Sequence, residues 1–333
     1  MSIALDAMGG DNGPAEIIAG ALEAAPLLHH EIIIIGNLEK LKPFLPEVLP
    51  KNISLMAASQ EVGMDEKPLE AYRNKKDSSL MVGIRLVKDG IAQAFVSAGN
   101  TGAVSATALL TWRQIAGLHR PAILSPMPNR NGRFALLDVG ASPDVDPEHL
   151  VEFAIMGRAY AEKIMGRINP KVYLLNIGEE EGKGNAFSKR AYQLLSKYHW
   201  FAGNIEGKDM YAKEVDIVVC DAFVGNVVLK TSEGIAELIV SMIKEGVPKS
   251  PLKAWKYAPL KGLMAPLKKH MDYAEVGGSP LLGLNGLCLI CHGRSNAKAI
   301  KNALLMAQLG IDNKLVDTIR ESVRLEIGDS KDE

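Results

Sequence analysis

One unit recurs along most of the chain: a short aliphatic run, a turn rich in Gly, Asn or Asp, and then a stretch with helical periodicity. Continuous apolar runs bounded by such turns are typical of strands buried on both faces, and strands that alternate with helices favour a mainly parallel sheet. We therefore predict a doubly wound α/β fold, an αβα sandwich, with residues 1–333 forming one unit. The expected strands are residues 3–8, 31–35, 92–98, 134–139, 171–177, 215–220 and 287–291.

Composition excludes several classes of protein. The 333 residues carry a net charge of −1, and aromatic residues make up only 5%, so the chain has neither the basic field nor the stacking residues of a nucleic-acid-binding protein. The first residues lack the basic region of a signal peptide, and three cysteines do not form a disulfide framework. We expect a cytoplasmic protein with reduced thiols.

The segment 232–272 interrupts the alternation, and we expect it to project as a helical insertion. Apolar residues at 235, 238, 239, 242 and 243 predict an amphipathic helix, which we expect to pack in a homodimer. Residues 246–271 then hold six lysines, four prolines and no acidic residue. We expect this part to contact a membrane surface reversibly. The expected contact residues are Leu252, Trp255, Leu260, Leu263 and Met264.

Polar loops follow six of the expected strands, at residues 6–11, 97–102, 138–141, 176–185, 221–226 and 292–296. The carboxyl ends of parallel strands meet at one edge of a sheet, so we expect these loops to line one crevice. Glycine turns followed by helix N-termini suit a phosphate, although any single turn could simply close a strand–helix connection. Lys183 is the only lysine in these loops, and we expect it to be the counter-charge.

Several known motifs are absent or incomplete. The string 178–184 resembles a nucleotide-binding P-loop, but its spacer is one residue short and Gly184 stands where a Ser or Thr should be. No dinucleotide fingerprint, nucleophile elbow or metal-ligand spacing is present, so we expect no cofactor and no metal. Cys288 and Cys291 precede His292 with the spacing of a haem-attachment site, but their apolar strand indicates buried core thiols; a redox pair is the alternative.

The loops together resemble one family, the bacterial phosphate acyltransferases of phospholipid synthesis. The likeness rests on DAMGGD at 6–11, SAGNTGA at 97–103, LDVGA at 137–141, NIGEEEGKGN at 176–185, DAFVGNVVLKTSEG at 221–234 and the segment from His292, and it extends to about residue 310. The resemblance implies a fold similar to phosphotransacetylases and, more remotely, to isocitrate and isopropylmalate dehydrogenases. It implies transfer of a long-chain fatty acyl group from acyl carrier protein to inorganic phosphate, by homodimers that sit on the inner face of the membrane. The acyl phosphate would pass to an acyltransferase that acts on glycerol 3-phosphate.

Phosphate is itself a nucleophile, so this reaction needs a site that holds two reactants in line and stabilises the thioester oxyanion. The interpretation assigns catalysis to Lys183, Asn226 and His292; for His292, a purely structural role at a strand end is equally open. Ala222, Ser142 and Arg294 depart from the residues that we expect in the family. The expected phosphate-binding residues are Gly99, Asn100, Thr101, Gly102 and Asn185, supported by Asp6, Asp11, Asp138 and Asp221.

Arg73, Lys75 and Lys76 form the densest basic cluster outside the insertion. We expect them to dock the acidic carrier protein, or else a phosphate group, at the mouth of the crevice, with an ordinary solvated loop as the alternative. Three other functions are open. A short-chain phosphotransacetylase would differ only in its acyl donor, a dehydrogenase would need an Asp cluster and an Arg clamp that the sequence lacks, and a membrane scaffold would leave the loops unexplained.

Overall fold

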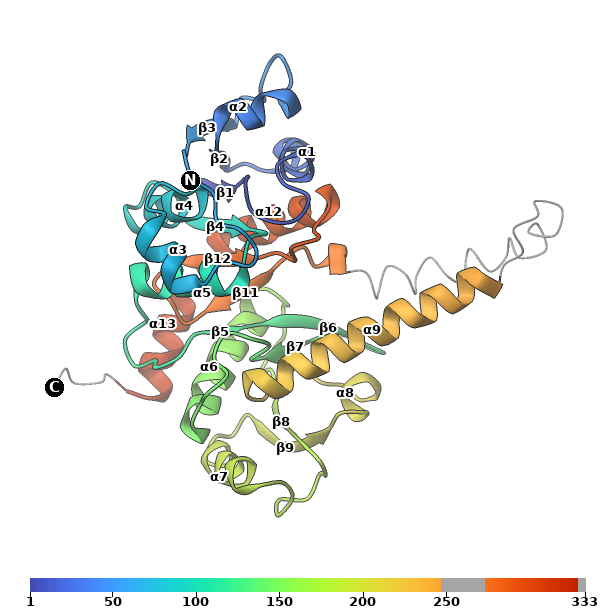
Figure 1. Cartoon of the computed structure of the whole chain (residues 1–333). Coiled ribbons are helices and arrows are strands. Elements are labelled where there is room, and N and C mark those ends of the chain that lie inside the picture. The colour runs from blue at the N-terminus through green and yellow to red at the C-terminus, as the bar shows by residue number, and fades with distance from the viewer. Residues whose placement is uncertain (247–272, 329–333) are drawn as a thin grey trace.

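The fold is described from a computed structural model, which describes residues 1–246 and 273–328. Its strands form two sheets that lie one above the other in Figure 1. The first sheet has seven strands in the order β3-β2-β1-β4-β12-β11-β5. Strands β3 to β12 of this order run parallel, while β11 is antiparallel to both of its neighbours. The bounds are β1 (Ser2–Asp6), β2 (Glu31–Gly36), β3 (Ile53–Ala57), β4 (Ala94–Ser97), β5 (Ala122–Ile123), β11 (Ser279–Leu282) and β12 (Leu287–Ile290).

The second sheet has five strands in the order β6-β7-β10-β8-β9. Only β6 is antiparallel, and it lies at the edge. Pro126 and Pro128 explain this position, because proline cannot donate to a second neighbouring strand. The bounds are β6 (Ser125–Asn129), β7 (Gly132–Leu137), β8 (Val172–Asn176), β9 (Phe201–Glu206) and β10 (Ile217–Val219).

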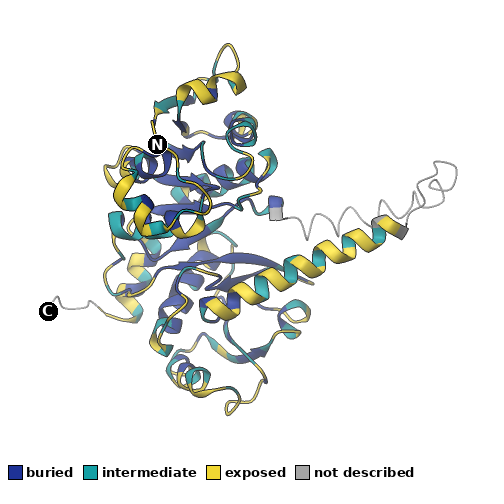
Figure 2. Cartoon of the chain, in the orientation of Figure 1, coloured by how far each residue is buried: buried dark blue, intermediate teal, exposed yellow. Residues whose placement is uncertain are grey.

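Helices cover the faces of both sheets, and the strands between them are buried (Figure 2). Against the first sheet, α1 packs along α12 on one side and α4 packs with α5 on the other. The long helix α6 lies against the second sheet and contacts α7 and α13. The bounds are α1 (Ala15–Ala24), α2 (Leu38–Leu41), α3 (Pro68–Asn74), α4 (Ser79–Lys88), α5 (Thr101–Trp112), α6 (Pro147–Lys163), α7 (Ala186–Leu195), α8 (Asp209–Ala212), α9 (Ala222–Gly246), α12 (Ala297–Asp312) and α13 (Leu315–Glu326), with short 3-10 turns η1 (Ala25–Leu27), η2 (Lys42–Phe44) and η4 (Tyr273–Glu275).

The α/β fold is confirmed, and each expected strand is present. The strands divide between two sheets, and β5 and β6, on either side of Leu124, carry the chain from one to the other. The proline-rich stretch 121–128 conceals these two strands because it lacks the continuous aliphatic run of a buried parallel strand.

Helix α9 extends away from both sheets in Figure 1. It runs without a break from Ala222 through Ser232, the expected first residue of the insertion. The helix expected over 235–243 is therefore confirmed as the outer part of a longer one. The five expected membrane-contact residues, Leu252, Trp255, Leu260, Leu263 and Met264, lie outside the described residues.

Candidate active site

Asp6 ties together two loops at the carboxyl end of the first sheet. Its buried carboxylate accepts a hydrogen bond from Ser97 Oγ at 2.7 Å and one from the amide of Met8 at 3.1 Å. Ser97 Oγ in turn accepts the amide of Gly99 at 3.0 Å. Burial raises the pKa of Asp6, and the hydrogen bond from Ser97 opposes that rise. Asp6 therefore fixes the start of the loop 97–102 through its hydrogen bond with Ser97.

The loops after β1 and β12 are also joined. The amide of Asp11 donates to the carbonyl of Gly293 at 2.7 Å. Gly10 has a φ of +88°, and a Cβ at that position would come within 2.9 Å of the same carbonyl. Only glycine meets both requirements. The exposed carboxylate of Asp11 lies close enough to His292 to affect the pKa of the imidazole.

Asp138 organises the matching corner of the second sheet. One carboxylate oxygen accepts the amides of Ile123, Gly140 and Ala141 at 2.9–3.0 Å, and the other accepts the amide of Ser142 at 2.8 Å. Burial raises the pKa of this carboxyl, while the four amides lower it. Because the amide of Ile123 belongs to β5, Asp138 links the crossover between the sheets to the loop after β7.

Helix α9 begins directly against this corner. Asp221 accepts the amide of Val224 at 2.9 Å and so caps the first turn. A Cβ on Gly225 would lie 1.9 Å from the carbonyl oxygen of Asp138, so glycine is required for the helix to approach this closely. The close approach places Asn226 at the edge of a cavity.

The cavity has a volume of about 810 Å³ and lies between α9, the β6–β7 hairpin and the strand ends of the first sheet. Its polar lining residues include Thr101 and His292 near the strand ends and Asn226 on α9, and its remaining wall is largely apolar. From Asn226 to Ala236, α9 follows the cavity for about 15 Å at the rise of an α-helix. The apolar residues of the wall are Ile123, Pro126, Met127, Pro128, Val139, Leu229, Ile235, Ala236, Val276 and Ile290.

Two basic side chains line this cavity, Lys230 from α9 and Arg133 from β7. Burial and then the charge of Lys230 lower the pKa of the His292 imidazole, while Glu233 opposes them. The Nδ1 atom of His292 is 3.2 Å from the amide of Arg294. A neutral imidazole in this position can accept a proton or a hydrogen bond from a bound anion.

Cys291 also reaches the cavity, but it is a poor nucleophile. Burial raises the pKa of its thiol to about 12, so the thiolate is scarce at neutral pH. Cys220 and Cys288 are buried too. The buried positions confirm the interpretation of these residues as core thiols.

The expected phosphate-binding loop 97–102 reaches the cavity through Thr101 and Gly102, which begin α5. Asn100 is instead the N-cap of that helix. Its Oδ1 accepts the amide of Ala103 at 3.0 Å, and its Nδ2 donates to the carbonyls of Met64 and Glu66. Gly99 lies behind the loop, next to Asp6.

Lys183 and Asn185 do not line the cavity, so the expected single crevice is wrong in this respect. The side chain of Lys183 is half exposed and pairs with Glu180 at 3.8 Å. Asn185 caps α7 and, with Asp221, borders a second, polar depression of about 500 Å³. The strands before these loops belong to the second sheet, whose edge does not bring the loop 176–185 against the first.

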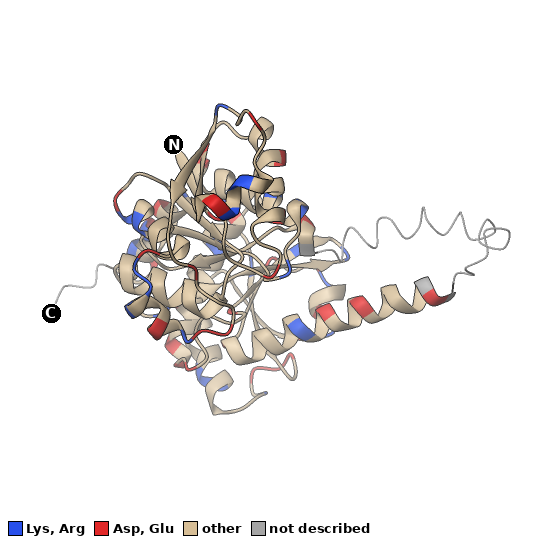
Figure 3. Ribbon diagram, turned by 45° about the horizontal axis from the view of Figure 1, so that its top comes forward, with Lys and Arg blue, Asp and Glu red and all other residues tan. Residues whose placement is uncertain are grey.

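The three basic residues expected to dock a carrier protein lie at the end of α3. Lys75 forms an ion pair with Glu66 and donates to the carbonyl of Glu61. Arg73 is exposed, and the ammonium of Lys76 lies 4.1 Å from the ring centre of Tyr72. In the chain as a whole, Lys and Arg are interspersed with Asp and Glu along the ribbon (Figure 3).

Sequence reasoning missed Arg133 and Lys230 as cavity residues. A signal for Lys230 was available, because Asn226, Lys230 and Glu233 follow one another at helical spacing and therefore share a face of α9. No such signal marks Arg133, whose approach depends on how α9 lies across the second sheet.

Comparisons with known proteins match nearly the whole chain. A family described as "Fatty acid synthesis protein" matches residues 1–316. A phosphate acyltransferase of Desulfitobacterium hafniense is 48% identical over 97% of this chain and 98% of its own length, and one of Wolinella succinogenes is 45% identical over 95% and 96%.

Solved structures show the same fold at low sequence identity. A phosphotransacetylase from Streptococcus pyogenes superposes with a TM-score of 0.61 at 17% identity, covering 94% of each chain. A branched-chain phosphotransacylase from Enterococcus faecalis superposes with a TM-score of 0.56 at 13% identity, covering 93% of this chain and 99% of its own. The expected likeness to phosphotransacetylases is thereby confirmed. The chain belongs to the phosphate acyltransferases, a family of acyl-transferring enzymes.

Proposed function

We propose that this enzyme transfers a long-chain fatty acyl group from acyl carrier protein to inorganic phosphate. The observation that carries the proposal is the cavity along α9, which is apolar over most of its wall and polar where the strand-end loops meet. A volume of about 810 Å³ far exceeds the space that phosphate and an acetyl group need. Each buried methylene of a longer acyl chain contributes about 0.8 kcal/mol of binding.

The chemistry needs no covalent enzyme intermediate. An oxygen of phosphate attacks the thioester carbonyl carbon, the new C–O bond forms, and the C–S bond breaks. The electron pair leaves with sulfur, which takes up a proton. The N-terminal turn of α5 borders the cavity through Thr101 and Gly102, and its backbone amides attract an anion. Lys230 and Asn226 would stabilise charge on phosphate and the oxyanion, with neutral His292 as hydrogen-bond partner.

Three further parts of the proposal concern partners. The exposed Arg73 and Lys76 would contribute to docking of the acidic carrier protein, whereas Lys75 supports the loop through its ion pair with Glu66. A second copy of the chain would pack on α9. The basic segment 246–271 would bind the inner face of the cell membrane from the cytoplasm and pass the acyl phosphate to the next acyltransferase. Among the described helices, none is long and apolar enough to cross a membrane.

Mass spectrometry tests the reaction directly. The purified protein is mixed with phosphate and either a long-chain acyl carrier thioester or acetyl-coenzyme A. We expect acyl phosphate from the first donor and little acetyl phosphate from the second. The reverse preference would make the enzyme a short-chain phosphotransacetylase, and the absence of both products would contradict the proposal.

Flotation with anionic liposomes tests the membrane contact separately. We expect the wild type to float and the variant Leu260→Glu plus Leu263→Glu to stay in solution, because added acidic groups oppose both insertion and charge attraction. A wild type that never floats, or a variant that floats equally, would contradict this part alone.

A further inference from the structure

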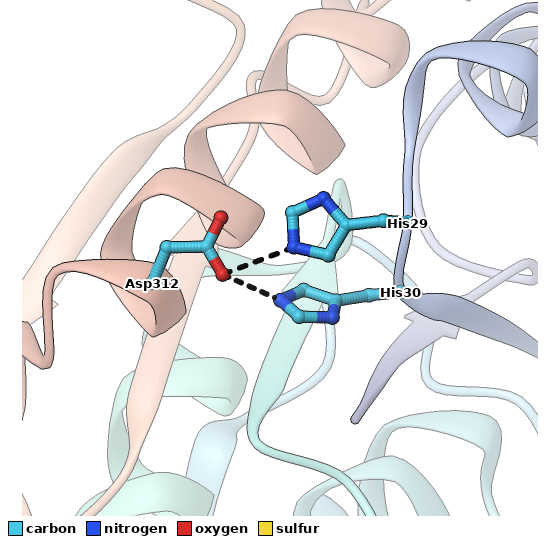
Figure 4. A group of neighbouring side chains, drawn as sticks. All are labelled: His29, His30 and Asp312. Carbon is cyan, nitrogen blue, oxygen red and sulfur yellow. Dashed lines mark hydrogen bonds and ion pairs between the residues drawn. The ribbon is translucent and has the colours of Figure 1, made fainter.

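A cluster of two histidines and an aspartate lies outside the cavity (Figure 4). The Nε2 atoms of His29 and His30 approach the same oxygen of Asp312, at 3.2 Å and 2.9 Å. His30 is buried at 5% exposure, whereas the side chain of His29 is 62% exposed. These three donor groups all lie within 4.8 Å of one another.

The local backbone produces this convergence. Successive residues of an extended strand point to opposite faces, but His29 and His30 lie in the bend before β2, and both rings face Asp312 (Figure 4). Asp312 is the last residue of α12. One turn earlier, Gln308 accepts the amide of His29 at 2.9 Å, which holds the bend against the helix.

We propose that His29, His30 and Asp312 bind a zinc ion. Two imidazole nitrogens and a carboxylate oxygen are a donor set that zinc prefers. With bonds of about 2.1 Å, the ligands of a tetrahedral ion lie about 3.4 Å apart. The two nitrogen–oxygen separations of 3.2 Å and 2.9 Å need to widen by only a few tenths of an ångström, and the two imidazoles offer nitrogen atoms within 4.8 Å of each other. Because the side chain of His29 is exposed to solvent, a water molecule can occupy the fourth coordination position of the zinc ion.

Zinc binding requires a change in the proton positions of both imidazoles, and the site permits this change. Each Nε2 that donates to the carboxylate carries a hydrogen in the metal-free protein. To bind zinc, each imidazole must present the Nε2 lone pair, so this hydrogen moves to Nδ1 through the solvent or is released. Protons therefore compete with zinc, and we expect the affinity to fall as the pH is lowered.

A second cluster, His119, His149 and Glu152, provides an internal contrast. Both oxygens of Glu152 accept hydrogen bonds from His119, one from the amide and one from the ring. Nδ1 of His149 accepts the amide of Asp146 in a capping box. Glu152 and His149 are therefore already engaged in hydrogen bonds to backbone amides around the start of α6. For this reason we prefer the first cluster as the metal site.

Zinc at this site would join segments 282 residues apart in the sequence. Closing so long a loop restricts the unfolded chain, so the expected role is structural: the ion would fasten the end of α12 to the start of β2.

Equilibrium dialysis of the untagged full-length protein, stripped with a chelator, tests the proposal. We expect one zinc ion per chain and a rise in Tm of about 2 °C or more with zinc but not with magnesium. His29→Gln and Asp312→Asn should each weaken zinc binding at least about tenfold. Cobalt provides a second readout, because its visible absorption bands report tetrahedral nitrogen and oxygen ligands.

His119→Gln, from the second cluster, is the matched control and should bind zinc like the wild type. Because His29 is exposed, His29→Gln should fold, and its circular dichroism spectrum verifies this. Absence of zinc binding by the wild type, equal binding by His29→Gln and Asp312→Asn, or loss only in His119→Gln would each overturn the proposal.

Discussion

The carboxylate of Asp138 satisfies four backbone amides with one side chain. In Asp138→Asn, the new NH₂ group would face the amide of Ser142, so two donors would meet in a buried position. We expect this variant to lose about 1–3 kcal/mol of unfolding free energy, the usual cost of a buried unsatisfied group. Thermal unfolding measures the loss. Asp144→Asn, in the exposed loop nearby, should leave Tm unchanged; equal Tm values for both variants would contradict this role.

Lys230 and Lys183 are both half exposed and both form an ion pair, with Glu233 at 2.8 Å and with Glu180 at 3.8 Å, but only Lys230 lines the cavity. We expect Lys230→Ala to lower kcat/KM for phosphate by about 10–10³-fold, because it removes a charge beside the developing oxyanion. Lys183→Ala should have a much smaller effect. Steady-state kinetics at low phosphate compare the two variants, and a larger loss in Lys183→Ala would return the catalytic role to the lysine that sequence reasoning selected.

The two lysines show how far a site can be predicted from sequence. The polar strand ends, including Asp6, Asp138 and Asn226, are recognisable because turn chemistry and strand pattern are local signals. Which of these loops meet depends on the division of strands between two sheets, and this division is a tertiary property. Lys183 follows β8 in the second sheet, so its place in a glycine-rich loop carried no information about its distance from the cavity.

His292 makes stability depend on pH in a defined direction. Burial and Lys230 lower the pKa of its imidazole in the folded protein. The unfolded state therefore binds more protons below about pH 6.5, and stability is lost as the pH falls through this range. We expect the Tm advantage of the wild type over His292→Gln to be smaller at about pH 5.5 than at about pH 7.5. The variant retains Asp6 and Asp138, so the titration of these two carboxyl groups affects both proteins equally and cancels from the difference in Tm. A constant difference would contradict the assigned pKa direction.

Among the elements, α9 presents two different faces. Asn226, Lys230 and Glu233 face the cavity, while an exposed apolar stripe begins at Ile235, which borders the far end of the cavity, and continues toward the outer end of the helix. The stripe residues follow i, i+3, i+4 and i+7 spacing, the pattern of a helix that packs against another element. The sequence pattern revealed this stripe correctly, because helical periodicity is local; it could not reveal that no other described element covers it. The residues are Ile235, Leu238, Ile239 and Met242.

A second copy of the chain is the partner that we propose for this stripe. Leu238→Glu plus Met242→Glu would place two charges, and their images from the second copy, in one symmetric interface. We expect light scattering after size-exclusion chromatography to show a dimer for the wild type and a monomer for the double variant. Glu237→Lys, on the cavity side of the helix, also changes the charge by two units and should remain dimeric. A monomeric wild type would contradict the proposed dimer.

For the molecule as a whole, the cavity lies at the junction of the two sheets, because strands of both sheets contribute residues to its wall. The crossover at Leu124 brings β5 into the first sheet and β6 into the second, and Asp138 fastens the junction by accepting the amide of Ile123. Helix α9 then lies across the opening. The length of the acyl chain that fits is therefore set by how far along α9 the apolar wall continues.

Ala236 lines the cavity ten residues beyond Asn226. A substitution at this position therefore tests whether the apolar wall along α9 limits the length of the acyl chain. Ala236→Phe should fill the far end and leave the phosphate end intact. Each methylene that loses its apolar contact costs about 0.8 kcal/mol, or about fourfold in kcat/KM. We expect the variant to prefer shorter acyl chains than the wild type, with an unchanged KM for phosphate, across a series of acyl carrier thioesters. Gly234→Ala, at a position with open space around it, is the matched control and should keep the wild-type preference. An unaltered preference in Ala236→Phe would mean that the acyl chain does not follow α9.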